Sequence, residues 1–251
     1  MKLSKKLTPV ALATTLALSG LAVSTPAVAG LSGNIGVHSK YLLRGIFEEN
    51  SGAAVQGGID YSNDSGFYVG YWGSSLGYSY DATGTSPYTS TGFENDIYAG
   101  YAGEAGGIAY DIGLLQYIYI SVDDSNLTEL TASVSMGDGY VGMQYLLTDG
   151  WWGNAGDVYW KAGYGFALPK EVSLAFDLGY YTYNDDDADN SELGAATTST
   201  SGFRHLNITL SHAVGTTGAE AYVQYTLAGE DRSGVEYDDT IVMGLTYGFD
   251  L

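Results

Sequence analysis

Apolar and polar residues alternate with a period of two along most of this chain, and this pattern constrains the fold more than any other feature. One face of the last segment carries Ile241, Met243, Leu245, Tyr247 and Phe249. Such alternation is typical of β-strands, whose successive side chains point to opposite faces. The pattern predicts strands in twelve segments: 34–47, 53–62, 67–78, 93–101, 108–120, 127–136, 140–147, 158–166, 172–183, 203–214, 219–228 and 239–251.

The connections between these segments alternate between short and long. The short ones are 63–66, 102–107, 137–139, 167–171 and 215–218. The others tend to be longer, as at 79–92 and 184–202. An antiparallel up-and-down meander places alternate connections at opposite ends, so we expect one tight end, which holds both termini, and one loop-rich end.

The start of the chain has the features of a secretory signal peptide. Basic residues open the chain, an apolar run covers 10–23, and the small residues Ala27 and Ala29 follow. The apolar run is too short for a helix that crosses roughly 30 Å of hydrocarbon. We therefore expect residues 1–29 to be cleaved during export and residues 30–251 to form a single domain.

Composition excludes several classes of protein. The chain has 29 acidic and 9 basic residues, a net charge of −20, and no cysteine. So acidic a chain is not expected to bind nucleic acid, because phosphate contacts need a basic face. The absence of cysteine excludes disulfides and thiolate metal sites. After residue 29, no segment is apolar over the length of a transmembrane helix.

Alternation alone fits both a soluble β-sandwich and a transmembrane barrel, because each has one apolar face. Export, the loop pattern and aromatic residues near the strand ends favour the barrel. The aromatic residues expected at the two membrane interfaces are Tyr41, Phe47, Tyr61, Phe67, Tyr101, Trp160, Phe166, Tyr180, Tyr247 and Phe249. We predict an all-β, antiparallel transmembrane β-barrel of about 12 strands in the outer membrane. Its expected partners are outer-membrane lipids, lipopolysaccharide and the barrel assembly machinery, which recognises terminal strands of this kind.

Four motifs add a family resemblance. They are 39–45 (SKYLLRG), 54–61 (AVQGGIDY), 65–74 (SGFYVGYWGS) and 94–104 (ENDIYAGYAGE). They resemble the TorF-like family, whose members are classed from their expected topology as outer-membrane porins of Gram-negative bacteria. The motifs cover the N-terminal third of the mature chain. The resemblance implies an outer-membrane location and a porin-like role, and it supplies no catalytic or substrate-binding residues.

Charged residues on the inward face are the candidates for a pore lining. If the first segment is one continuous strand, it directs two basic residues inward. The candidates are Lys40, Arg44 and Lys161, opposed by Asp96, Glu129 and Asp177. Charged rings set ion selectivity in channels, so the hypothesis is a porin for passive diffusion of small solutes or ions. The alternative is that these charges pair across a plugged lumen and stabilise it.

Glycine is frequent at inward positions, for example at Gly70, Gly100, Gly163 and Gly244. Barrels of about 8 strands are filled by side chains and those of 16–18 strands hold an aqueous channel, so twelve strands allow a narrow pore. Glycine at inward positions either leaves space for water or lets the strands coil and bend. The sequence leaves both explanations open.

Signals for an enzyme or a metal site are weak, so we expect no catalytic residues, no metal and no cofactor. The run that starts at Asp185 resembles a calcium loop, but Asn190 and Ala196 replace the required glycine and glutamate. Arg204 is expected to face lipid near the outer rim. A non-conducting barrel that displays acidic loops for surface or adhesive interactions is the alternative function. A barrel-embedded lipid-active enzyme is a weaker one, and the oligomeric state stays open.

Overall fold

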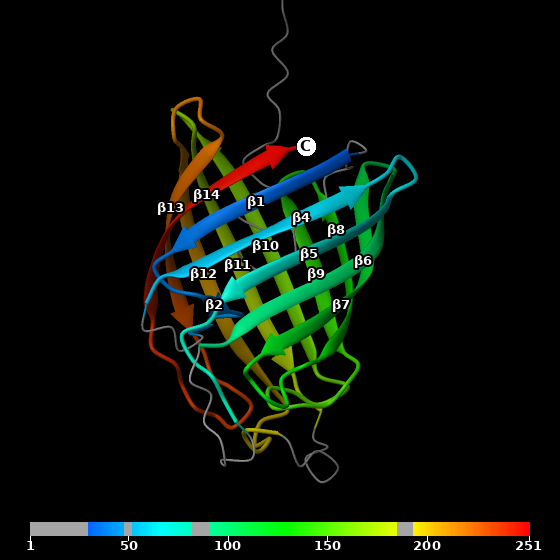
Figure 1. The fold of residues 1–251 in the computed structure, drawn as a ribbon, viewed down its shortest axis with the longest axis vertical. Helices are drawn as coiled ribbons and strands as arrows, with labels where there is room; N and C mark the ends of the chain where they lie inside the picture. The colour runs from blue at the N-terminus through cyan, green and yellow to red at the C-terminus, as the bar shows by residue number, and fades with distance from the viewer. Residues whose placement is uncertain (1–29, 48–51, 82–90, 185–192) are drawn as a thin grey trace, which may run out of the picture.

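The computed structural model describes residues 30–47, 52–81, 91–184 and 193–251, and in them the chain forms a closed antiparallel β-barrel of twelve wall strands (Figure 1). Neighbouring strands in the sequence are neighbours in the barrel, as expected for an up-and-down meander. The predicted fold class is therefore confirmed. The predicted signal peptide and the acidic run that starts at Asp185 lie outside the described residues.

The wall strands agree with eleven of the twelve predicted segments to within a few residues, because the buried and exposed positions follow the period-two pattern. They are β1 (Gly30–His38), β4 (Ala54–Ser62), β5 (Phe67–Ser75), β6 (Phe93–Ala105), β7 (Ile108–Ile120), β8 (Thr128–Met136), β9 (Gly139–Leu146), β10 (Val158–Leu168), β11 (Val172–Thr182), β12 (Ser201–Ala213), β13 (Ala219–Ala228) and β14 (Thr240–Asp250).

The barrel closes where β1 pairs with both β14 and β4. Ile35 lies opposite Tyr247 on one side of β1 and opposite Gly57 on the other. The short turns lie at the same end as the start of β1 and the end of β14, which is the upper end in Figure 1. We call this the turn end, and the opposite end, where the longer connections lie, the loop-rich end.

The outer wall is apolar. Across its middle, large exposed side chains form a belt: Ile35, Ile59, Ile97, Ile112, Leu114, Val141, Leu178, Leu210, Val223 and Met243. Several exposed aromatic residues lie nearer the two ends: Tyr61, Phe67, Tyr101, Phe166, Tyr247 and Phe249 toward the turn end, and Trp160, Tyr180 and Phe203 toward the loop-rich end. The exposed Tyr71 and Tyr164 lie closer to the middle of their strands. This is the distribution that a barrel in a bilayer requires. In the described part of the chain, no helix is long and apolar enough to cross a membrane.

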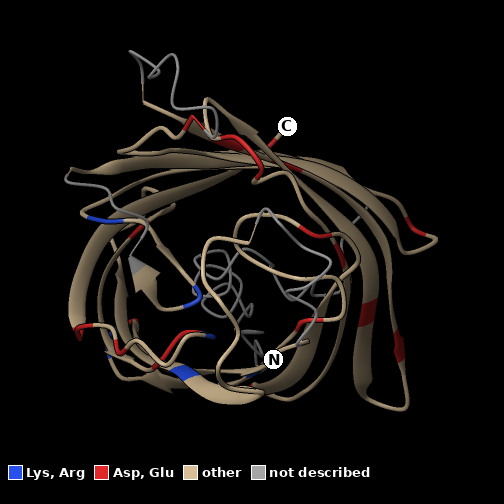
Figure 2. Ribbon diagram, turned by 90° about the horizontal axis from the view of Figure 1, so that it is seen from below, with Lys and Arg blue, Asp and Glu red and all other residues tan. Residues whose placement is uncertain are grey.

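The first predicted strand, 34–47, is wrong in its second half. β1 ends at His38, and the chain then forms a small hairpin of β2 (Leu42–Leu43) and β3 (Ile46–Phe47) inside the barrel (Figure 2). Arg44 and Gly45, between its two strands, have φ angles of 51° and 78°. A two-residue turn with both φ angles positive is a favoured hairpin turn, which is why the chain reverses here.

This inward segment also takes two expected interface residues off the wall strands: Tyr41 precedes β2 and Phe47 lies in β3. Tyr41 is 5% exposed and belongs to an apolar cluster inside the barrel, together with Leu115, Tyr117 and Leu146. Leu43 packs against the same cluster. The hairpin therefore contacts the side of the lumen formed by β7 to β9.

Tyrosine rings lie against several inward-facing glycines, and these contacts explain why glycine occupies those positions. A Cβ atom added at one of these glycines would overlap a tyrosine side chain on a neighbouring strand: Tyr98 at Gly70, Tyr68 at Gly100, Tyr140 at Gly163 and Tyr222 at Gly244. At these positions the glycines make room for tyrosine rings on the inner wall. The rings take up space in the lumen that water would otherwise occupy.

Candidate pore constriction

Arg44, at the tip of the β2–β3 hairpin, is the centre of the candidate site. Its side chain is 5% exposed, and Nη2 donates to both carboxylate oxygens of Glu129 on β8 at 2.7 Å. Nη1 donates to the hydroxyl of Tyr181 on β11 at 2.5 Å. The guanidinium therefore links the hairpin tip to two separate parts of the barrel wall.

Glu129 is 1% exposed, and neutral donors surround it in addition to Arg44. The Tyr117 hydroxyl and Gln144 Nε2 each donate to Glu129 Oε2 at 3.0 Å. The Arg44 guanidinium also lies 4.7 Å from the ring centre of Tyr159 and 5.5 Å from that of Trp152. A buried carboxylate and a buried guanidinium are stable only when paired and hydrogen-bonded, and this site provides both conditions.

Arg204 lies in the lumen, so the expectation that it faces lipid is wrong. Opposite Gly179 and Tyr180, the β11–β12 pairing shifts by one residue, with His205 and Phe203 as partners, so that Arg204 is the extra residue of a bulge. Its side chain is 6% exposed. A bulge turns a side chain that alternation places on one face toward the other, and sequence pattern alone does not locate it.

The bulge lets Arg204 contact two segments at once. Arg204 Nε donates to the backbone carbonyl of Arg44, and Nη1 donates to that of Glu230, both at 3.1 Å. Glu230 lies in the connection between β13 and β14 at the loop-rich end. Arg204 therefore joins the hairpin tip to a loop at that end of the barrel.

The structure brings together only some of the six predicted pore residues. Arg44 and Glu129 form an ion pair, and Asp96 is buried nearby, within reach of both charges. Lys161 is also buried, and the charges that act on it include those of Arg44, Glu129 and Asp177. Asp177 accepts a hydrogen bond from the Tyr140 hydroxyl at 2.8 Å.

Lys40 is separate from this group. It follows β1 in the segment that leads into the hairpin, and its Nζ donates to Thr240 Oγ1 at the start of β14 at 2.7 Å. Neither Lys40 nor Arg44 lies on a wall strand, because the strand ends at His38. The prediction that they point inward from the first strand is therefore wrong in its geometry, although Arg44 reaches the lumen by way of the hairpin.

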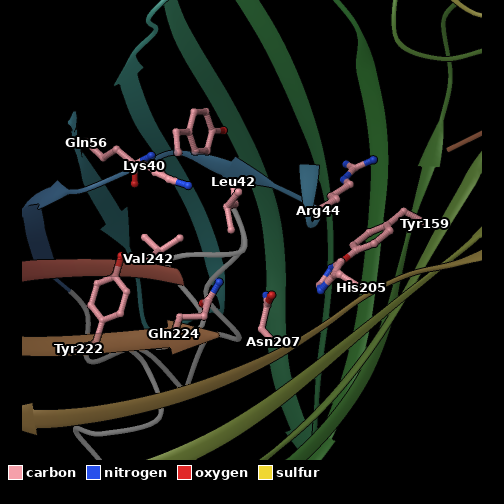
Figure 3. A pocket seen from close by; sticks show the side chains of 11 residues that line it. Lys40, Leu42, Arg44, Gln56, Tyr159, His205, Asn207, Tyr222, Gln224 and Val242 are labelled. Atoms are coloured by element: carbon pink, nitrogen blue, oxygen red, sulfur yellow. The ribbon is translucent and has the colours of Figure 1, made fainter. Parts of the chain in front are cut away.

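A cavity lies between the hairpin and the wall formed by β12 to β14 (Figure 3). It has an empty volume of about 440 Å³, which includes space open to solvent. Arg44, Tyr159 and His205 gather at one end of it in Figure 3, and Lys40 and Gln56 at the other. The opposite side of the hairpin packs against the apolar cluster, so the cavity lies on the side of the hairpin that faces away from that cluster.

A second ion pair holds loops together at the loop-rich end. Arg232 Nη2 donates to both carboxylate oxygens of Asp157 at 2.9 Å, which joins the β13–β14 loop to the residue before β10. Burial raises the pKa of Asp157, and the Arg232 charge opposes that rise. Partial burial also acts on Asp231, but hydrogen bonds from Ser233 and Val235 outweigh it and lower the pKa of Asp231.

Sequence reasoning missed the tyrosines of this site and Arg232 of the loop ion pair, and it placed Arg204 on the wrong face. Tyr117, Tyr159 and Tyr181 all fall at inward positions of their strands, so the alternation was the available signal for them. Arg204 and Arg232 had no such signal, because a bulge and a loop position them. Among the residues that the structure describes, no group of three His, Asp or Glu side chains is placed to hold a metal ion.

Comparison with solved structures identifies similar barrels. The KdgM porin matches with a TM-score of 0.53 and 10% identity, over 87% of this chain and 99% of that chain. The NanC porin matches with a TM-score of 0.51 and 10% identity, over the same shares. The outer membrane phospholipase A from Escherichia coli matches with a TM-score of 0.46 and 13% identity, over 87% of this chain and 96% of that chain.

At such low identities, the two porin matches show a shared fold and nothing finer. No curated protein sequence matches this chain significantly. A family model does match, over residues 23–249, which is nearly the whole chain. The chain therefore belongs to the family described as "Bacterial protein of unknown function (Gcw_chp)".

Proposed function

We propose that this protein is an outer-membrane channel, a porin for the passive diffusion of small solutes or ions. One observation carries the proposal: a closed barrel with an apolar outer wall encloses a lumen that holds charged side chains from several strands. Buried charge is costly, and a barrel that serves only as an anchor can fill its interior with uncharged side chains. The fold shared with two porins and the resemblance to the TorF-like family are consistent with this role.

The lumen favours cations over anions. Among the described residues, its inner face carries more acidic than basic side chains. The acidic ones are Asp60, Glu94, Asp96, Asp111, Glu129, Asp177 and Glu220, and the basic ones are Lys40, Arg44, Lys161 and Arg204. Rings of acidic side chains select cations in channels.

Liposome swelling tests the channel proposal. We expect liposomes that contain the protein to swell in isotonic solutions of small sugars, and to swell more slowly as the sugar becomes larger, because the solute has to pass beside the hairpin. Protein-free liposomes are the control. The Arg44→Ala variant is tested in parallel, in case the hairpin limits entry. If neither protein supports swelling, the channel proposal is wrong and a non-conducting barrel that displays its acidic loops is favoured.

Arg44 is expected to oppose cation flow. Replacing Arg44 with alanine removes a positive charge at the constriction and leaves Glu129, so the ratio of cation to anion permeability should rise. The measurement is the reversal potential across a planar bilayer in a potassium chloride gradient. Lys170→Ala removes the same charge from an exposed residue in the turn between β10 and β11, and it should leave the ratio unchanged. An equal shift in both variants would contradict a role for Arg44 in selectivity.

The alternative that the barrel is a lipid-active enzyme needs a separate test. We propose no catalytic residues and no cofactor for this barrel. Hydrolysis of an ester lipid analogue by the purified protein would overturn that part of the proposal.

A further inference from the structure

The β2–β3 hairpin is not part of the barrel wall. β1 pairs with β4 as far as His38 and Ala54, so the wall is closed before the chain turns inward. Among the described residues, β2 and β3 form ladder pairs with each other and with no wall strand. The hairpin can therefore leave the lumen without breaking any ladder that closes the barrel.

We propose that this hairpin is a movable plug of the channel, held in the lumen by Arg44, by the fit of Gly45 and by Arg204. The inference rests on the proposed channel function and assigns a regulatory role to the same site. It gives a role to a hairpin that occupies part of a charged lumen and leaves a cavity beside it.

Arg44 supplies the electrostatic part of the contact. Its hydrogen bonds to Glu129, Tyr117 and Tyr181 reach strands β8, β7 and β11. A buried guanidinium that loses its carboxylate partner is strongly destabilised at that position. Removal of Glu129 therefore favours a position in which the Arg44 guanidinium meets water, and removal of Arg44 takes away the hydrogen bonds that tie the tip to the wall.

Gly45 supplies the steric part. A Cβ atom added at Gly45 would overlap Cβ of His205 on β12, so the hairpin tip sits directly against the wall. The φ angle of 78° at Gly45 also disfavours any residue with a side chain. A valine at this position cannot occupy the docked position, whatever happens to the charges.

Arg204 is a positioning residue for the plug. It binds the backbone carbonyl of Arg44 at the tip and that of Glu230 in the loop between β13 and β14. A change at the loop-rich end can reach the tip through this one side chain. Arg204→Ala should therefore loosen the plug without altering a charge on the hairpin.

The test measures single-channel conductance and open probability in planar bilayers. The variants are Arg44→Ala, Glu129→Gln, Gly45→Val and Arg204→Ala. The wild type should open for part of the time, which is enough for slow swelling of liposomes, and each variant should show a severalfold higher open probability. The matched controls are Lys170→Ala for lost positive charge and Gly52→Val, because a Cβ at Gly52 meets open space. Heat-modifiable electrophoretic mobility checks that each barrel is folded, and four independent variants keep the test valid if one misfolds.

The outcomes distinguish the plug proposal from the channel proposal. High open probability in the variants and low open probability in the wild type and controls supports both. Equal conduction by the wild type and the folded variants overturns the plug and leaves the channel. Lower conduction by the variants than by the wild type also overturns the plug. If folded wild type and folded variants all fail to conduct, the channel function itself is overturned.

Discussion

Replacing Leu114 with arginine is expected to lower the free energy of unfolding in a lipid bilayer by about 2–4 kcal/mol. Leu114 lies near the middle of β7, and its side chain points outward and is 53% exposed. A charged side chain on the lipid face costs most at the bilayer midplane, where no water or headgroup solvates it. The measurement is a denaturant titration of the protein folded into lipid vesicles.

Ile108→Arg is the matched control for this prediction. Ile108 is the first residue of β7, on the same outer face as Leu114 but at the turn end. The cost of a charge falls to about 0–1 kcal/mol near the interface, so this variant should be nearly as stable as the wild type. Equal losses at both positions would contradict the depth dependence, and with it the placement of this wall in a membrane.

Replacing Gly163 with valine is expected to lower the free energy of unfolding by about 2–6 kcal/mol. Overpacking accounts for about 1–3 kcal/mol of this loss, and a buried polar group left without its partner accounts for about 1–3 kcal/mol. A Cβ at Gly163 would overlap the Tyr140 ring and lie 2.7 Å from Asp177 Oδ1. The ring has to move, and Asp177 then loses the hydrogen bond that Tyr140 donates. The free energy of unfolding in vesicles measures the loss.

A double-mutant cycle identifies the cause. If the clash with the ring accounts for the loss, Gly163→Val should cost much less in a Tyr140→Ala background, because the smaller side chain leaves room for valine. Gly202→Val is the control for the substitution itself, since a Cβ at Gly202 on β12 meets open space. Additive effects of Gly163→Val and Tyr140→Ala would contradict the packing described here.

The Tyr140 and Asp177 contact has two counterparts on the described part of the inner wall. Tyr98 donates to Asp60 and Tyr68 donates to Asp111 in the same way. Each tyrosine covers a glycine on a neighbouring strand: Gly70 by Tyr98, Gly100 by Tyr68 and Gly163 by Tyr140. Glycine makes room for the ring, and the ring hydroxyl pairs with the carboxylate. This arrangement gives a physical reason for the combination of glycine, tyrosine and aspartate at these positions.

Much of the site was within reach of sequence reasoning, but its geometry was not. The period-two pattern correctly directed Glu129, Asp96 and Lys161 into the barrel, because a strand residue has only two faces to choose from. The same pattern failed at Arg44 and Arg204. A positive-φ turn and a bulge break the alternation at these residues, and both depend on backbone conformation that the pattern does not encode.

The sequence by itself determined the order of the antiparallel strands, their number and the two unequal ends, whereas closure of the barrel pairs β1 with β14, at opposite ends of the described chain. Local alternation decides the faces of each strand, and short turns force neighbouring strands to pair, so these features follow from local rules. The tertiary structure decided what fills the lumen. A hairpin lies inside the barrel, and its tip is held by distant residues. Arg44 pairs with Glu129, 85 positions away, and Arg204 donates to the backbone of Arg44, 160 positions away. Contacts at such separation depend on closure of the whole barrel, and no local pattern contains them.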